Sequence, residues 1–198
     1  MKLKAIAALC KAAEQYFLYD NCPAERDPAD GQWIGTQAAV YLTQNLPHLT
    51  EDTLQAMWDI PKKKWNLALV STSYTAPEWC STVPNDPGDL SADLLGISIN
   101  VAGEEIFPLQ TDAGLLFVEE KYLRPIADEL GEITLVSRAG YDEQPILAAK
   151  KGTNLVALIR PRHLEKETKT VQRIRALAAG LGGVTCVVDP ATGELVEK

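Results

Sequence analysis

Residues 118–161 constrain the fold more than any other stretch, because they combine one helical segment with three short apolar runs. The segment VEEKYLRPIADEL is followed by GEITLVSR, then by QPILAAKKG and NLVALIRPR. Gly, Pro or charged residues separate the runs, as is typical of turns between strands. The stretch therefore predicts a helix and three consecutive strands, and it contains no catalytic motif.

The first part of the chain predicts the same order of elements. Leu3, Ile6 and Cys10 recur at helical spacing within residues 2–13. Three strand-like runs follow this helix, at 15–20, 32–36 and 38–43. Further along, Thr50 is a good N-cap residue for a helix over 49–59.

The second half adds one strand, at 114–118, before its helix at 122–130. Its three later strands are expected at 133–137, 145–149 and 155–159. After them, Val171, Ile174 and Leu177 predict an amphipathic helix, and a PATG turn predicts a final hairpin. The expected fold class is therefore α+β: two β-α-β-β-β-like halves with antiparallel sheets, plus a C-terminal helix and hairpin.

Changes in composition divide the chain into four segments. We expect a first half at 1–70, a linker or surface loop at 71–93, a second half at 94–164 and an extension at 165–198. The loop is rich in Pro, Ser, Thr and Asp. Trp79 in its middle is expected to hold the loop to the body, and the alternative is an aromatic residue that binds a partner.

Three short motifs of the second half carry a family resemblance: Tyr122-Leu123, Gln144-Pro145-Ile146 and Leu158-Ile159-Arg160-Pro161-Arg162. Together with the repeated order of elements, they resemble the closing segment of bacterial DNA sliding clamps, the polymerase processivity factors. The resemblance implies helices that face DNA and attract its phosphates without reading bases. The residues it implies are Lys2, Lys4, Lys11, Lys121 and Arg124.

The chain departs from the clamp pattern in several ways. It is shorter than clamp subunits of two or three domains, no strand precedes its first helix, and Pro125 falls within the second helix. The motifs LYD at 18–20, QWIG at 32–35 and MWDIPKKK at 57–64 are similar to small prophage proteins of Gram-positive bacteria. That second resemblance implies no particular activity.

The charge of the chain is unevenly distributed. The formal net charge is −8, yet residues 150–175 hold eight basic and two acidic side chains, which leaves −14 for the rest. Four of these basic residues would share one stripe of a helix that begins near residue 162: Arg162, Lys166, Lys169 and Arg173. Such a stripe could contact a phosphate backbone, dock an acidic protein or simply be solvated.

Cysteine and histidine spacing predicts neither a metal site nor a cofactor. Cys10, Cys22, Cys80 and Cys186 are scattered and form no CxxC pair. No run reaches 18 apolar residues, so we expect no membrane contact. Free thiols and a cytoplasmic location are the corresponding expectations.

No nucleophile, phosphate-loop or zinc-protease motif is present, so we expect a non-enzymatic protein. The first hypothesis is a clamp-like accessory factor in DNA replication that contacts double-stranded DNA, a DNA polymerase or another replication protein. Its candidate DNA contacts are Lys4 and Lys11 with the four residues of the basic stripe. The alternative is a protein-interaction module without nucleic-acid binding, and a homo-oligomer is compatible with both.

Overall fold

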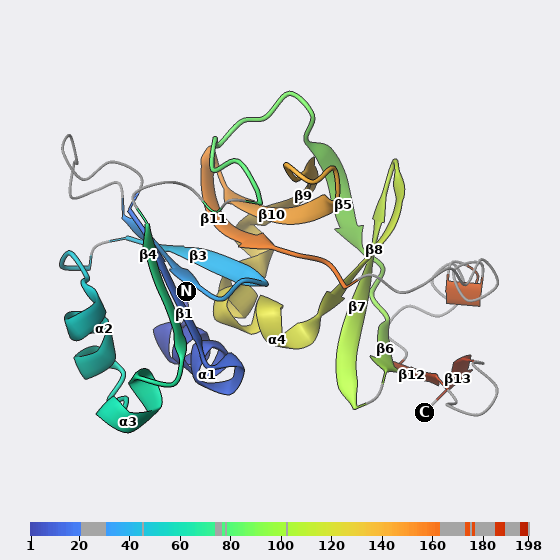
Figure 1. Ribbon diagram of the computed structural model, residues 1–198. Coiled ribbons are helices and arrows are strands. Elements are labelled where there is room, and N and C mark those ends of the chain that lie inside the picture. Colours follow the sequence, from blue (N-terminus) through green and yellow to red (C-terminus); the bar gives the residue numbers. More distant parts are fainter. Residues whose placement is uncertain are drawn as a thin grey trace.

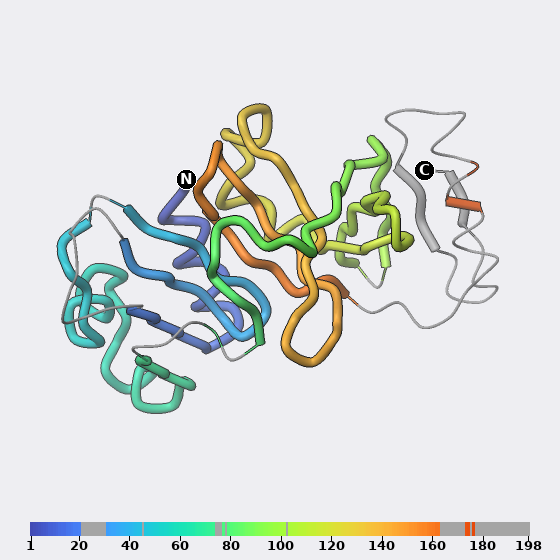
Figure 2. Tube along the Cα trace, turned by 90° about the horizontal axis from the view of Figure 1, so that it is seen from above, coloured from blue at the N-terminus to red at the C-terminus, as the bar shows by residue number. Residues whose placement is uncertain are grey.

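The computed structural model describes residues 1–20, 31–44, 46–73, 77, 79–101, 103–162, 173–174, 176, 185–188 and 195–197. Within these residues, thirteen strands form one large open sheet accompanied by few helices, which confirms the α+β class. Figure 1 shows the first and last helical segments below the central strands and two short helices at the left edge, and Figure 2 shows an elongated molecule.

The N-terminal half begins with one helix and three antiparallel strands: α1 (Leu3–Ala13), β1 (Gln15–Tyr19), β2 (Gln32–Gly35) and β3 (Ala39–Thr43). Two short helices and an edge strand follow: α2 (Glu51–Met57), α3 (Lys62–Trp65) and β4 (Leu69–Ser73). The strand β4 returns to pair in parallel with β1.

Four strands of the second half precede its helix: β5 (Leu90–Leu94), β6 (Ser98–Val101), β7 (Glu104–Thr111) and β8 (Gly114–Glu119). The helical segment comprises α4 (Glu120–Leu123) and the 3-10 helix η2 (Arg124–Glu132). Three antiparallel strands follow it: β9 (Ile133–Ala139), β10 (Pro145–Lys151) and β11 (Asn154–Ile159). The final strands β12 (Thr185–Val188) and β13 (Leu195–Glu197) pair antiparallel, which confirms the predicted hairpin.

The two helix-plus-three-strand units meet through their last strands. β3 pairs antiparallel with β11, so the order across the centre of the sheet is β1-β2-β3-β11-β10-β9. The N-terminus of α1 also touches η2, since the Lys2 N–H donates to the Pro125 carbonyl at 2.7 Å. The two units are thus joined both through one continuous sheet and through their helical segments. The repeated order agrees with the prediction, whereas the likeness to a sliding clamp stays a prediction.

One face of the central sheet is covered by the helices. Ile6 and Cys10 from α1 and Ile126 from η2 are almost completely buried against Tyr41 and Leu147 of the sheet. The expected core position of Cys10 is therefore confirmed. Close packing of these apolar side chains is the main source of stability on this face.

The opposite face is covered by the connection between β4 and β5. Trp79 and Cys80 are buried there against Val40 and Leu158, which confirms that Trp79 holds the connection to the body. Two strands bound this connection, because β4 extends to residue 73 and β5 begins at residue 90. The connection is thus a packed layer of the fold.

Arg138 on β9 fixes the end of this connection. Its Nε and Nη2 donate to the two carboxylate oxygens of Asp89 at 2.7 and 2.8 Å, and its Nη1 donates to the Val83 carbonyl at 2.6 Å. Arg138 is 1% exposed, so these bonds satisfy a charge that is otherwise costly to bury.

Local signals account for several element boundaries. The Thr50 side chain accepts from the Thr53 N–H and caps α2 as predicted. Pro125 limits α4 to one turn, and the segment continues as a 3-10 helix instead of the single helix expected over 122–130. The strands β5 and β6 are separated at Gly96, whose φ of 70° breaks the extended backbone.

Candidate functional site

Two of the predicted phosphate-binding residues, Lys4 and Lys11, lie on the exposed side of α1. They are seven positions apart and therefore share one face of the helix. Among the residues that the structure describes, no carboxylate lies within ion-pair distance of either side chain. Both ammonium groups face solvent.

The predicted basic stripe is described only at its two ends. Arg162 lies in the non-helical segment after β11, where its Nη1 is 3.5 Å from Glu119 Oε1. Arg173 is exposed and helical. Lys166 and Lys169 lie outside the described residues, as does most of the predicted tail helix.

The other cations implied by the clamp resemblance are engaged by carboxylates. Lys2 pairs with Asp128 at 2.7 Å, Lys121 with Glu119 at 2.5 Å and Arg124 with Glu120 at 2.6 Å. Such exposed pairs add little to stability, but they neutralise charge that would otherwise attract phosphate. These three cations are therefore less available to phosphate than the sequence predicts.

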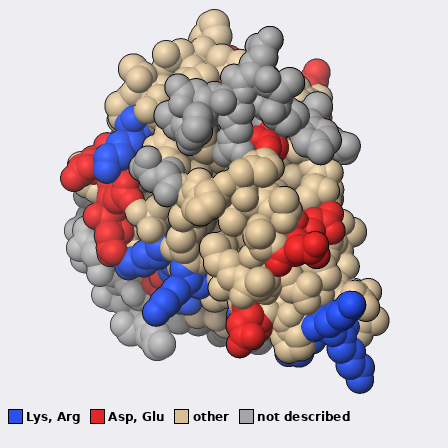
Figure 3. All heavy atoms as spheres, turned by 90° about the vertical axis from the view of Figure 1, so that its left-hand side faces the viewer, with Lys and Arg blue, Asp and Glu red and all other residues tan. Residues whose placement is uncertain are grey.

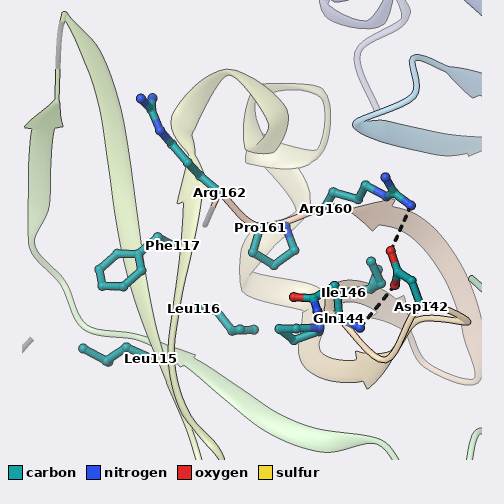
Figure 4. Close-up of a pocket in the computed structure, with 10 residues that line it drawn as sticks. Leu115, Leu116, Phe117, Asp142, Gln144, Ile146, Arg160, Pro161 and Arg162 are labelled. Atoms are coloured by element: carbon teal, nitrogen blue, oxygen red, sulfur yellow. Dashed lines mark hydrogen bonds and ion pairs between the residues drawn. The ribbon is translucent and has the colours of Figure 1, made fainter. Parts of the chain in front are cut away.

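A different arrangement of residues forms an open hollow of about 360 Å³ between β8 and the ends of β10 and β11. Its lining combines apolar side chains with four polar ones at the rim, as Figure 4 shows. The lining residues are Leu115, Leu116, Phe117, Asp142, Gln144, Pro145, Ile146, Arg160, Pro161 and Arg162.

The backbone beside this hollow is open for pairing. Within the sheet, β8 pairs only with β7, and the Phe117 carbonyl instead accepts from the Arg162 N–H at 2.7 Å. Because backbone groups alternate along an antiparallel strand, Leu115 points its N–H and C=O away from β7 as well. No described group bonds to them, so a short stretch of strand edge faces the hollow.

Arg160 joins the hollow to the packed connection. Its guanidinium lies 5.1 Å from the centre of the Trp79 ring, and its Nη2 is 3.5 Å from Asp142 Oδ2. Arg160 Nε and Trp79 Nε1 are buried without a hydrogen-bond partner. Buried donors are normally satisfied, so these two unpaired N–H groups are unusual in a folded protein.

The turn between β9 and β10 positions Asp142 and Gln144. The Asp142 carboxylate accepts from the Gln144 N–H at 3.2 Å, and Glu143 adopts a left-handed φ of 61°. A Cβ at Gly140 would lie 2.8 Å from the Trp79 carbonyl oxygen, so only glycine fits where this turn meets the connection. The rim of the hollow is thus tied to the body.

A second hollow of about 350 Å³ lies at the other end of the molecule, beside the N-terminus of α2. His48 Nδ1 is 3.3 Å from the buried Asp20 carboxylate, and Glu51 accepts a hydrogen bond from Thr72 at 2.9 Å. Three acidic side chains line it, including Asp52. An acidic lining repels phosphate, so this hollow does not extend the basic residues of α1.

Cys10 and Cys80 are poorly placed for thiolate chemistry. Both are free and buried, and burial raises the pKa of Cys10 to about 12 and that of Cys80 to about 11. Over the described ranges, no three His, Cys, Asp or Glu side chains are grouped so as to hold a metal ion.

Sequence reasoning did not identify the hollow as a site. The sequence marks Arg160, Pro161 and Gln144 only through the family resemblance. It marks residues 115–117 only as part of a strand. An unpaired edge cannot be recognised in a single strand sequence, because it depends on long-range pairing. The available signal was the Arg-Pro-Arg sequence that ends an apolar run.

No protein-family model, characterised protein or solved structure is significantly similar to this chain. None of the helices in the described part of the molecule has the length and apolar character needed to cross a membrane.

Proposed function

We propose that this protein is a non-enzymatic, clamp-like accessory factor in DNA replication that binds an extended segment of a DNA polymerase or another replication protein. One observation carries the proposal: the hollow beside β8 combines an apolar floor, an open strand edge and underused arginine donors. Peptide segments bind such edges through main-chain hydrogen bonds, while pockets for alternate side chains provide specificity.

The residues of the hollow define what it can accept. Leu116 and Ile146 form an apolar floor suited to an aliphatic or aromatic side chain, while Phe117, next to Leu116 on β8, projects from the other face of the strand. The N–H and C=O of Leu115 can pair with the backbone of an added strand. Arg160 and Arg162 are about one-third exposed, and their carboxylate partners are as far as 3.5 Å away. An acidic residue next to an apolar one is therefore the best-matched segment.

The repeated architecture supports the clamp-like part of the proposal. Two units of one helix and three strands share a sheet, and their helical segments lie against each other on one face. The residues after β11 that resemble a clamp's closing segment are Arg160, Pro161 and Arg162, and all three line the hollow. Nucleic-acid binding alone is less well supported, because three of the five cations that the resemblance implies are paired with carboxylates.

Short displayed peptides, selected on the wild-type protein, test this function. A selected peptide should bind Leu115→Glu at least about tenfold more weakly, because a buried charge would oppose both the floor and the strand edge. Leu67→Glu is the matched control at an exposed leucine far along the chain. Equal binding to all three proteins would contradict the proposal.

The accessory role requires a second measurement. A replicative polymerase that contains the selected motif should extend primed DNA further per binding event when the protein is added. Leu115→Glu should abolish this gain. If the wild-type protein does not change the product lengths, the replication role is contradicted, although peptide binding is not.

Direct contact with the DNA backbone is a second candidate function, favoured by the solvent-facing Lys4 and Lys11 on α1. Binding of a labelled duplex should weaken with salt. The logarithm of the binding constant should fall against the logarithm of the salt concentration with a slope of about −0.9 for each phosphate contacted. Lys4→Glu/Lys11→Glu should abolish it. Loss only in Arg162→Glu/Lys169→Glu/Arg173→Glu would assign the contact to the tail instead.

A further inference from the structure

The edge strand β4 is unusually well suited to pairing with another chain. Among the strands that the structure describes, it ends the sheet and pairs with β1 alone, and its sequence LVSTS contains neither charge nor proline. Proteins commonly protect exposed edges with lysine, proline or a bulge, and no such residue occurs within these five positions.

Hydrogen bonds on the inner side show which groups of β4 face outward. The Leu69 N–H donates to the Glu14 carbonyl, and the Ser73 carbonyl accepts from the Asp20 N–H. Residues 69, 71 and 73 therefore bond to β1, and the N–H and C=O groups of Val70 and Thr72 point away from the sheet. No described group bonds to these outward groups.

We infer that β4 is a self-association edge, at which a second copy of this chain pairs antiparallel about a twofold axis at Ser71. This register places Val70 opposite Thr72 of the second copy, and the reverse. All four outward-facing residues then form hydrogen-bonded pairs, which is the geometry an antiparallel ladder requires. The small Ser71 side chains meet at the axis without collision.

The charges at the two ends of β4 complement each other in this arrangement. The start of β4 follows α3, whose Lys62, Lys63 and Lys64 are exposed, and no described carboxylate lies within ion-pair distance of them. The end of β4 lies beside the N-terminus of α2, where Glu51 accepts from Thr72. Figure 1 shows α3 and this N-terminus at opposite ends of the strand. Antiparallel pairing therefore brings the basic end of each copy to the acidic end of the other.

The surface around β4 also favours a second copy over a charged ligand. Leu67 and Leu69 are 77% and 53% exposed, which is unusual for leucine. Figure 3, which looks onto this end of the molecule, shows uncharged surface between groups of charged side chains, with basic and acidic residues side by side in the group at the left. Two chains that each carry −8 can approach most easily where surface charge is lowest.

Sedimentation equilibrium over a roughly hundredfold concentration range tests the inference. The wild-type chain should form a dimer. Thr72→Pro removes one outward N–H that the monomer does not use, and should raise the dimer dissociation constant at least about tenfold. Ser71→Glu places two like charges at the axis and should also weaken the dimer. It replaces Thr72→Pro as the test variant if circular dichroism shows that the proline variant is unfolded. Leu115→Glu, at the distant hollow, should dimerise normally.

Charge reversal identifies the register. A Lys62→Glu/Lys63→Glu/Lys64→Glu chain and a Glu51→Lys/Asp52→Lys chain should each dimerise poorly alone, and should form a heterodimer when mixed. A wild-type chain that stays monomeric throughout would overturn the inference. So would a dimer that Thr72→Pro and Ser71→Glu leave unchanged.

Discussion

The two faces of the central sheet are stabilised by different chemistry. The helix-covered face is closed by regular elements whose apolar side chains pack with Tyr41 and Leu147. The connection-covered face is closed by an irregular segment, which Trp79 and the Arg138–Asp89 pair hold in place. The hollow adjoins the second face, because Arg160 reaches it from beside Trp79. The comparison teaches that apolar packing alone can close one face, whereas the face that shapes the binding surface also depends on a buried ion pair.

Removing the polar anchor should have the largest effect on stability. Asp89→Ala leaves the Arg138 guanidinium buried without its carboxylate, which should cost about 3–5 kcal/mol in the free energy of unfolding. Chemical denaturation of this variant and of Asp93→Ala, an exposed control on the strand that follows Asp89, measures the difference. An equal decrease in the free energy of unfolding of both variants would show that the Arg138–Asp89 pair contributes no more than an exposed aspartate does.

A cavity-creating substitution on each face should distinguish the packing of the two faces by its cost in the free energy of unfolding. Leu147→Ala under the helices should cost about 2–5 kcal/mol, because rigid helices cannot collapse into the space. Leu158→Ala, equally buried under the connection, should cost less because the irregular segment can adjust. Denaturant midpoints with unchanged slopes give both values. A larger loss at Leu158 would reverse the comparison.

Acid should weaken the connection-covered face selectively. Burial alone would raise the pKa of Asp89, but the hydrogen bonds and charge of Arg138 outweigh it, so the pKa lies below its ordinary value. The resulting stability is complete above the unfolded-state pKa, about 3.9, and is lost as pH falls through the lower folded-state value. Stability measured against pH should therefore fall more steeply below this point in the wild type than in Asp89→Asn. Identical slopes would assign the acid sensitivity elsewhere.

Loss of a helix cap should have the smallest effect. Thr50→Ala removes the side-chain acceptor for the Thr53 N–H and should cost about 1 kcal/mol. Thr50→Ser keeps the hydroxyl and is the matched control. A thermal midpoint that falls equally for both would indicate that packing of the threonine methyl group matters instead.

Local features of the fold could be predicted because they depend on neighbouring residues. The Thr50 cap, the buried Cys10 and the anchoring Trp79 each follow from short patterns. The pairing of β3 with β11 could not be predicted, because registry between distant strands leaves no mark in either strand alone. The bidentate bond between Arg138 and Asp89 joins residues 49 positions apart, and for that reason neither stood out.

The candidate site was less predictable than the fold. The sequence directed attention to charge, and Lys4 and Lys11 are indeed exposed on α1. It did not indicate that Lys2, Lys121 and Arg124 would be paired with carboxylates, since those contacts depend on side-chain placement. Arg162 was expected on a basic stripe, yet it lies beside Phe117 and Glu119 at the hollow. The apolar residues of the floor carry no charge, so the charge pattern of the sequence could not indicate them.

Nuclear magnetic resonance of the isotope-labelled protein, titrated with a peptide selected on the wild type, tests the binding-site assignment most directly. The account predicts that the largest shifts will be those of the Leu115 and Phe117 amides and the Trp79 indole N–H, while the α1 amides near Lys4 and Lys11 stay unchanged. Shifts confined to α1, or spread evenly over the molecule, would contradict the assignment of partner binding to the hollow.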